Sequence, residues 1–231
     1  MDLKNSLKCF LNKRITPPYQ IISLGVNCYA KTFLTKFKFK KKKDSGELTL
    51  PFDFTFYTKA KYITEFIEND FSQYFEELYF IPENQYWGKA RKIFFSHETD
   101  FKENEKEKLV QMYSKRIENF YSAINNNKPT LFFQVLTDRD GEEDILNLFE
   151  VLNRKIKSRF ILAVVDCDGV INRELREEIC VLKLQKPTPD YDFYSKKCYK
   201  SSKGKEFERK IEKFVCKVIS DKLNQKVVKY F

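Results

Sequence analysis

IISLGVNCYAKTFL, residues 21–34, sets the architecture of the chain. From Tyr19 to Leu24 the sequence is apolar enough for a short buried strand, and Gly25 ends that run. Beyond the glycine, apolar residues recur at helical spacing, at Val26, Ala30, Phe33 and Leu34. The sequence therefore predicts a strand, a tight turn and a helix, with Asn27 and Cys28 in or just after the turn.

Cys28 is thus expected where the carboxyl end of a strand meets the amino end of a helix. Open α/β sheets bind their ligands at that point. Free backbone N–H groups and the helix dipole favour anions there, and they lower the pKa of a thiol, whose thiolate is the nucleophile. A small buried cysteine that fills space between helix and strand is the alternative interpretation, and spacing alone leaves both open.

The remainder of the chain alternates between apolar strands and amphipathic helices. We expect strands at residues 93–95, 130–136, 159–165 and 179–184, and helices at residues 103–125, 142–157 and 207–223. Residues 59–79 are expected to form one helix or two shorter ones, and residues 186–204 a long loop. Such alternation indicates βαβ units and a mostly parallel sheet covered on both faces. The prediction is a single-domain, Rossmann-like, three-layer α/β fold over residues 19–231, preceded by an amphipathic N-terminal extension, residues 1–18.

The net charge of +10 indicates an anionic small molecule, phosphate or acidic glycan as partner, unless it reflects a general enrichment in lysine. Six of the eight residues at 36–43 are Lys, which predicts an exposed loop or a rim that steers phosphates or glycans. Nucleic acid is not expected as a partner, because few basic residues cluster with the patterns of RNA-binding modules. The sequence does not indicate an oligomeric state.

The cysteines predict free thiols in a reducing cytoplasm. They are Cys9, Cys28, Cys167, Cys180, Cys198 and Cys216. None forms a C-x-x-C pair, and one histidine does not complete a zinc site of usual spacing, so no metal site is expected. No apolar signal region and no apolar run of about 18 residues is present, so we expect no membrane-spanning segment.

His97 is the only histidine, and it follows the predicted strand at residues 93–95. Because strand ends of one polarity share an edge of a parallel sheet, we expect His97 and Cys28 to meet. The imidazole would then take the thiol proton, and the thiolate would attack an acyl carbon. A structural histidine is the alternative interpretation.

Three carboxylates are candidates to orient the imidazole: Asp53, Glu98 and Asp100. Asp53 lies between Phe52 and Phe54, where a buried carboxylate needs a partner, and capping the next helix is its alternative role. Backbone N–H groups after Gly25, with the side chain of Asn27, are the candidate oxyanion hole. The sequence lacks both a second glycine for the dinucleotide fingerprint and a phosphate-binding lysine loop.

Four short blocks occur in order: Ser23-Leu24-Gly25-Val26-Asn27-Cys28, then Pro51-Phe52-Asp53-Phe54, then Phe95-Ser96-His97, then Arg116-Ile117-Glu118-Asn119-Phe120. Together they resemble a bacterial family described as papain-like cysteine peptidases of uncharacterised function. The resemblance covers about residues 20 to 165. It implies Cys28 as nucleophile and His97 as base, with Asp53 as a further matched polar position.

The same resemblance places Arg116 and Gln134 among candidate substrate-binding residues, beside Gly25 and Asn27. Gln134 stands where the family often has Arg, Phe54 where it has Trp, and Glu98 where an Asp often follows the His. The family is also similar to proteins of surface-glycan synthesis. A papain-like fold carries its cysteine on a long central helix and its histidine on a β-barrel half, whereas the alternation here indicates a Rossmann-like sheet.

These observations predict a cytoplasmic, cysteine-dependent hydrolase or acyl-transfer enzyme with a Cys28–His97 pair, in surface-glycan synthesis or modification. Two alternatives remain. One is a coenzyme A-dependent glycan acyltransferase, with coenzyme A as the one cofactor considered. The other is a non-catalytic module that binds an acidic polymer and uses Cys28 only structurally.

Overall fold

A computed structural model of the chain gives the fold. It describes residues 17–25, 28–42, 45–57, 59–81, 85–88, 93–95, 97–98, 101–137, 139–193 and 195–230. The predicted helix in the N-terminal extension lies outside the described residues, as do Asn27 and Asp100.

Four parallel strands form the central sheet, in the order β1-β6-β7-β8. Their bounds are β1 (Gln20–Ser23), β6 (Thr130–Val135), β7 (Phe160–Asp166) and β8 (Ile179–Lys183). Every residue of β6 and β7 is buried, as expected for strands covered on both faces. The predicted parallel sheet is confirmed.

The sheet is the middle of three layers, because the side chains of each strand point alternately into two different hydrophobic cores. Ile22 and Phe132 pack into a core with α3 (Ala60–Glu68), α4 (Lys106–Ile124) and α5 (Glu142–Lys155). Ile21 and Phe133 pack on the other face against α2 (Tyr29–Lys36) and α7 (Ser202–Lys217). The predicted three-layer α/β fold is therefore confirmed.

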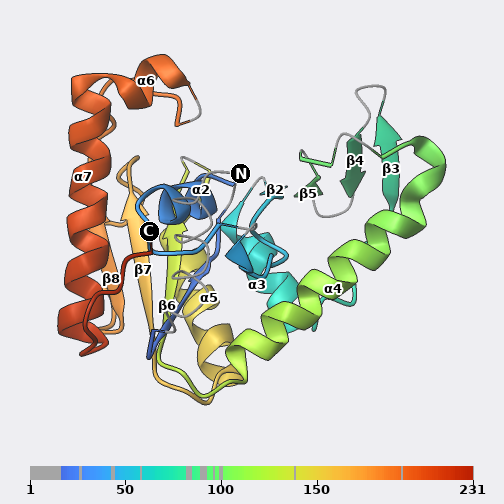
Figure 1. Ribbon diagram of the computed structural model, residues 1–231, viewed down its shortest axis with the longest axis horizontal. Helices are drawn as coiled ribbons and strands as arrows, with labels where there is room; N and C mark the ends of the chain where they lie inside the picture. The colour runs from blue at the N-terminus through green and yellow to red at the C-terminus, as the bar shows by residue number, and fades with distance from the viewer. Residues whose placement is uncertain are drawn as a thin grey trace, which may run out of the picture.

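A second sheet is antiparallel, in the order β2-β5-β4-β3, and lies beside the amino-terminal end of α4 (Figure 1). Its strands are β2 (Phe56–Tyr57), β3 (Leu78–Ile81), β4 (Gln85–Gly88) and β5 (Ile93–Phe94). Residues 93–95 do contain the predicted strand. The expectation that it ends at an edge of the parallel sheet was wrong, because β5 pairs antiparallel with β2 and β4.

Residues 59–79, for which one helix or two shorter ones were expected, hold one helix, α3, which ends at Glu68. Asp70 and Phe71 have φ angles of +51° and +59°, which a right-handed helix does not accept. At the other end of the chain, α6 (Lys196–Lys200) interrupts the predicted long loop. Helix α7 begins early, at Ser202, because the Ser201 hydroxyl accepts the N–H of Gly204 at 3.0 Å and caps it.

Two short helical segments adjoin the long helices α4 and α7. They are the 3₁₀ turn η2 (Glu103–Glu105) before α4 and the π-helical turn η3 (Val218–Lys222) after α7. In the part of the chain that the structure describes, no helix has the length and apolarity needed to cross a membrane.

Candidate active site

Cys28 occupies the N-cap position at the amino end of α2, five residues after the end of β1. The N–H of Leu24 still donates to the Phe133 carbonyl at 2.8 Å, and the buried Gly25 follows. The Cys28 carbonyl accepts the first helical N–H, from Thr32, at 2.9 Å. The thiol residue is half-buried, so the structure places it at the predicted junction of strand and helix.

Other thiols lie in surroundings that disfavour a thiolate. Burial raises the pKa of the Cys167 thiol to about 12, and it also raises the pKa of Cys180 and of Cys216. A raised pKa leaves less of the thiolate, which is the nucleophilic form, at neutral pH. Among these four cysteines, Cys28 alone lies at a helix amino terminus at the carboxyl edge of the parallel sheet.

Asp53 is fully buried, and its carboxylate joins three segments of the chain. One oxygen accepts the hydroxyl of Ser23, the last residue of β1, and the other accepts the N–H of Leu50 at 2.9 Å. The ammonium groups of Lys31 and Lys40 each lie 3.8 Å from it. Burial raises the pKa of Asp53, but the two lysines outweigh that effect and hold it below its usual value.

The two lysines and Glu47 complete a buried ionic cluster with Asp53. Lys40 lies 3.5 Å and Lys31 3.9 Å from the Glu47 carboxylate. Burial, aided by the neighbouring Lys40, lowers the pKa of Lys31 to about 8. The prediction of an exposed lysine loop was wrong for Lys40, which is only 4% exposed, because two carboxylates draw it inward.

His97 follows β5, and its exposed ring meets the Phe54 ring edge-on, with 5.4 Å between centroids. Partial desolvation lowers the pKa of His97 below 6.5; Glu98 opposes this shift and the Arg116 guanidinium adds to it. The ring is therefore neutral at neutral pH and able to accept a proton.

Glu98, a predicted orienting residue, is held by Arg116 of α4. The Arg116 guanidinium lies 2.9 Å from the Glu98 carboxylate, and the Tyr113 hydroxyl donates to the same oxygen at 3.2 Å. The guanidinium also lies over the Tyr113 ring, 4.2 Å from its centroid. Arg116 is thus buried beside the histidine, and its predicted role in substrate binding stays a prediction.

Two consecutive residues, Asp53 and Phe54, connect the helix that follows Cys28 with the side chain of His97. Lys31, three positions after Cys28 on the same side of α2, reaches Asp53, while Phe54 contacts His97. The structure therefore links the segments that carry the two predicted catalytic side chains. Direct pairing of the thiol with the imidazole stays a prediction.

Gln134 is completely buried in β6, and its amide oxygen and nitrogen have no hydrogen-bond partner among the described residues. It follows Phe133, whose carbonyl binds the Leu24 N–H, so it lies one residue beyond the last paired residue of β1. An unsatisfied buried amide is costly, and functional sites are one place where that cost is retained.

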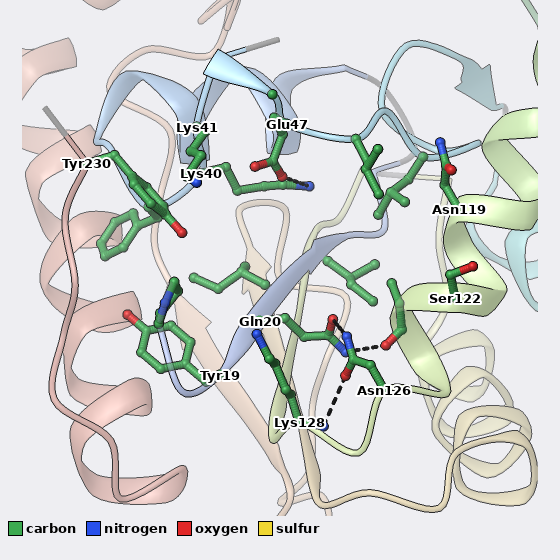
Figure 2. A pocket seen from close by; sticks show the side chains of 18 residues that line it. Tyr19, Gln20, Lys40, Lys41, Glu47, Asn119, Ser122, Asn126, Lys128 and Tyr230 are labelled. Carbon is green, nitrogen blue, oxygen red and sulfur yellow. Dashed lines mark hydrogen bonds and ion pairs between the residues drawn. The ribbon is translucent and has the colours of Figure 1, made fainter. Parts of the chain in front are cut away.

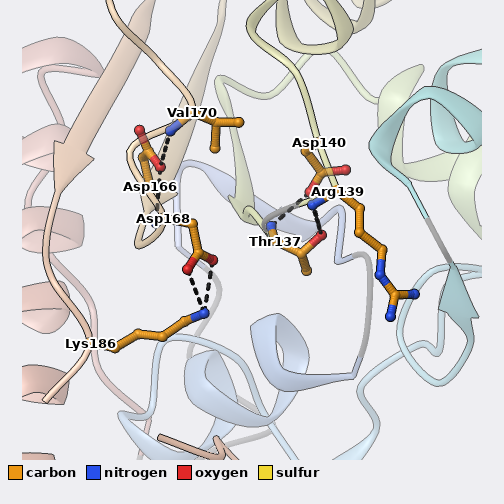
Figure 3. A network of polar contacts seen from close by, with 7 residues as sticks. All are labelled: Thr137, Arg139, Asp140, Asp166, Asp168, Val170 and Lys186. Atoms are coloured by element: carbon orange, nitrogen blue, oxygen red, sulfur yellow. Dashed lines mark hydrogen bonds and ion pairs between the residues drawn. The ribbon is translucent and has the colours of Figure 1, made fainter. Parts of the chain in front are cut away.

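The loops after β6 and β7 are fixed by carboxylates that the sequence analysis did not treat as site residues (Figure 3). Asp166 accepts the N–H groups of Val170 and Ile171 at 3.0 and 2.9 Å. Asp140 accepts the Thr137 N–H at 2.8 Å and the Ala60 N–H at 2.6 Å. The sequence offered a signal for Asp166, which directly follows the predicted strand at residues 159–165, but not for Asp140, which lies five residues beyond the end of β6.

Arg139, in the loop after β6, was also not singled out from the sequence. Its exposed guanidinium extends away from this loop and forms no ion pair within the described part of the chain (Figure 3). An exposed guanidinium near the carboxyl edge of the parallel sheet is a suitable anchor for an anionic group. No group of three His, Cys, Asp or Glu residues in the described ranges could hold a metal ion.

Comparison with known proteins gives one match. A family model described as "putative papain-like cysteine peptidase" matches residues 19–168, a span that contains Cys28, Asp53 and His97. Searches of the curated proteins and of the solved structures found no match.

Proposed function

The chain belongs to the family described as putative papain-like cysteine peptidases, and from this we propose that it is a cysteine-dependent hydrolase. In this proposal Cys28 is the nucleophile and His97 the general base. The observation that carries it is the position of Cys28 at the amino end of α2, five residues after the end of the central-sheet strand β1.

The reaction begins with transfer of the Cys28 thiol proton to the neutral imidazole of His97. The thiolate forms a bond to an acyl carbon of the substrate, and the leaving group departs with the proton from the imidazolium. Water then attacks the acyl-enzyme, with His97 again as base, and releases the acid and the free thiol. Backbone N–H groups that follow Gly25, with Asn27, stabilise the oxyanion in this scheme.

Asp53 acts in this proposal as a positioning residue. Its two carboxylate oxygens are already engaged by Ser23, Leu50 and the two lysines. By holding the end of β1 and the first turn of α2 together, the carboxylate fixes the segment that carries Cys28. Phe54, the next residue, supports His97 through its ring contact.

Gln134, Arg116 and Arg139 are the proposed substrate-binding side chains. Gln134 contributes an amide without a partner among the described residues, and Arg139 an exposed cation. Acyl transfer to a glycan would use the same nucleophile, with a glycan hydroxyl in place of water as the acceptor, and acyl-coenzyme A would be an alternative acyl donor. No contact described above favours either one, so hydrolysis is the function we propose.

The test is hydrolysis of an activated ester, p-nitrophenyl acetate, by the purified chain. We expect a burst of p-nitrophenol followed by a slower steady rate, with an acetyl adduct on the Cys28 peptide by mass spectrometry. Cys28→Ala should abolish the burst, and Cys198→Ala, which removes another half-buried thiol, should retain it. An equal burst from Cys28→Ala would reject the proposal.

A further inference from the structure

β1 is an edge strand, and one of its sides has no strand partner among the described residues. The N–H groups of Gln20 and Leu24 donate toward β6, to the carbonyls of Pro129 and Phe133 at 3.0 and 2.8 Å. Ile21 alternates with these residues, so its backbone N–H and C=O point to the free side. An unpaired strand edge of this kind is a template for another strand.

A cavity of about 310 Å³ lies along this free edge (Figure 2). Asn119 and Ser122 of α4 form one wall, and Tyr230 near the end of the chain stands opposite. Lys40 and Glu47 line the groove toward the carboxyl end of β1. We call this cavity the β1 groove.

The β1 groove offers an apolar contact beside the unpaired backbone. Leu48 lines it and is 59% exposed, one of two large hydrophobic side chains that are exposed in the described part of the chain. Leu50 and Ile22 continue the apolar lining toward the strand. An exposed leucine over an unpaired edge is the arrangement that a second strand would cover.

The charge of the β1 groove indicates the kind of ligand that it fits. Lys41 and Lys128 lie toward its opposite ends, and neither forms an ion pair with any described residue (Figure 2). Glu47 is the one carboxylate among the lining residues, and Lys40 and Lys31 already hold it. The free charge in the groove is therefore positive, which complements an acidic ligand.

We propose that the β1 groove binds an extended, acidic peptide segment of a partner protein, which adds a strand to the free edge of β1. The backbone of Ile21 pairs with the peptide, an apolar side chain covers Leu48, and flanking carboxylates reach Lys41 and Lys128. Binding here does not require the reaction at Cys28.

The test is fluorescence anisotropy with a short, end-capped, fluorescein-labelled peptide in which Glu alternates with Val. We expect saturable binding to the full chain, which the double variant Lys41→Glu/Lys128→Glu weakens by about tenfold or more. The matched double variant Lys42→Glu/Lys157→Glu changes net charge equally at exposed residues outside the groove, and it should bind within about twofold of the parent.

Changes in the peptide separate strand pairing from charge attraction without altering the fold. N-methylation of alternate peptide amides removes their hydrogen bonds and should abolish binding, and bound parent peptide should slow hydrogen exchange at the Ile21 amide. Equal binding of the N-methylated peptide, equal loss in both lysine variants, or no binding at all would overturn the proposal. Unchanged binding by Cys28→Ala keeps this result separate from the proposed hydrolase activity.

Discussion

At the level of one residue, the buried amide of Gln134 is expected to have opposite effects on stability and on the proposed activity. Its buried amide makes no hydrogen bond within the described residues, so Gln134→Met should raise the free energy of unfolding by about 1–2 kcal/mol. The same variant should lower the rate of ester hydrolysis if the amide binds substrate. Urea unfolding and the p-nitrophenyl acetate assay measure the two effects.

Gln20 provides the matched control for that substitution. Its amide nitrogen donates to the Ala123 carbonyl and to the Thr130 hydroxyl, each at 2.7 Å. Gln20→Met should therefore lower the free energy of unfolding by about 1–2 kcal/mol, opposite in sign to the effect at Gln134. If Gln134→Met also lowers it, the amide of Gln134 has a structural partner and the argument for a substrate contact fails.

Lys31 gives the protein a pH dependence of stability with a definite sign. Burial lowers the pKa of Lys31 from 10.5 to about 8 in the folded chain. Between these values the unfolded chain binds more protons than the folded chain, so the free energy of unfolding should rise with pH relative to Lys31→Met. Urea titrations of both proteins from pH 8 upward measure the difference.

An exposed lysine supplies the control for this pH effect. Lys42→Met removes an ammonium group from an exposed residue, and its difference from the parent should stay constant over the same pH range. If the free energy of unfolding of the parent relative to Lys31→Met stays constant or falls as the pH rises, Lys31 is not a buried, easily deprotonated amine.

At the scale of elements, Asp53 holds the end of β1, the first turn of α2 and the segment before β2 together. Asp53→Asn would leave two buried lysines with only Glu47 as a counter-charge, and should lower the free energy of unfolding by roughly 3–5 kcal/mol. The half-buried pair of Asp168 with Lys186 is the comparison, and Asp168→Asn should cost less than about 1 kcal/mol. Equal losses measured by urea unfolding would refute the role of the cluster.

The elements that the sequence predicted well are those with strong local patterns. The β1–α2 junction, β6, α5, β7 and β8 follow from buried runs and helical periodicity. The antiparallel sheet was missed because two of its strands, β2 and β5, are only two residues long and their order depends on pairing between distant segments. The partners of Asp53 could not be predicted for the same reason, since Ser23, Lys31 and Lys40 belong to different segments.

At the scale of the whole molecule, both cores share the parallel sheet, and the antiparallel sheet packs into one of them through Leu78, Tyr86 and Ile93. We therefore expect one cooperative unfolding transition for the single predicted domain. Trp87, the only tryptophan, lies in β4 and reports on the antiparallel sheet, while far-ultraviolet circular dichroism reports on the whole chain. Coincident urea transitions are expected, and an earlier Trp87 transition would identify the antiparallel sheet as a separate unit.

The central claim is that Cys28 and His97 act as a pair, and competitive alkylation tests it most directly. A limiting dose of iodoacetamide, followed by peptide mass spectrometry, should label Cys28 faster than the other cysteines. His97→Ala should remove this preference while the labelling of Cys198 stays unchanged. Labelling of Cys28 at the same rate as Cys198, or an undiminished preference in His97→Ala, would contradict the account.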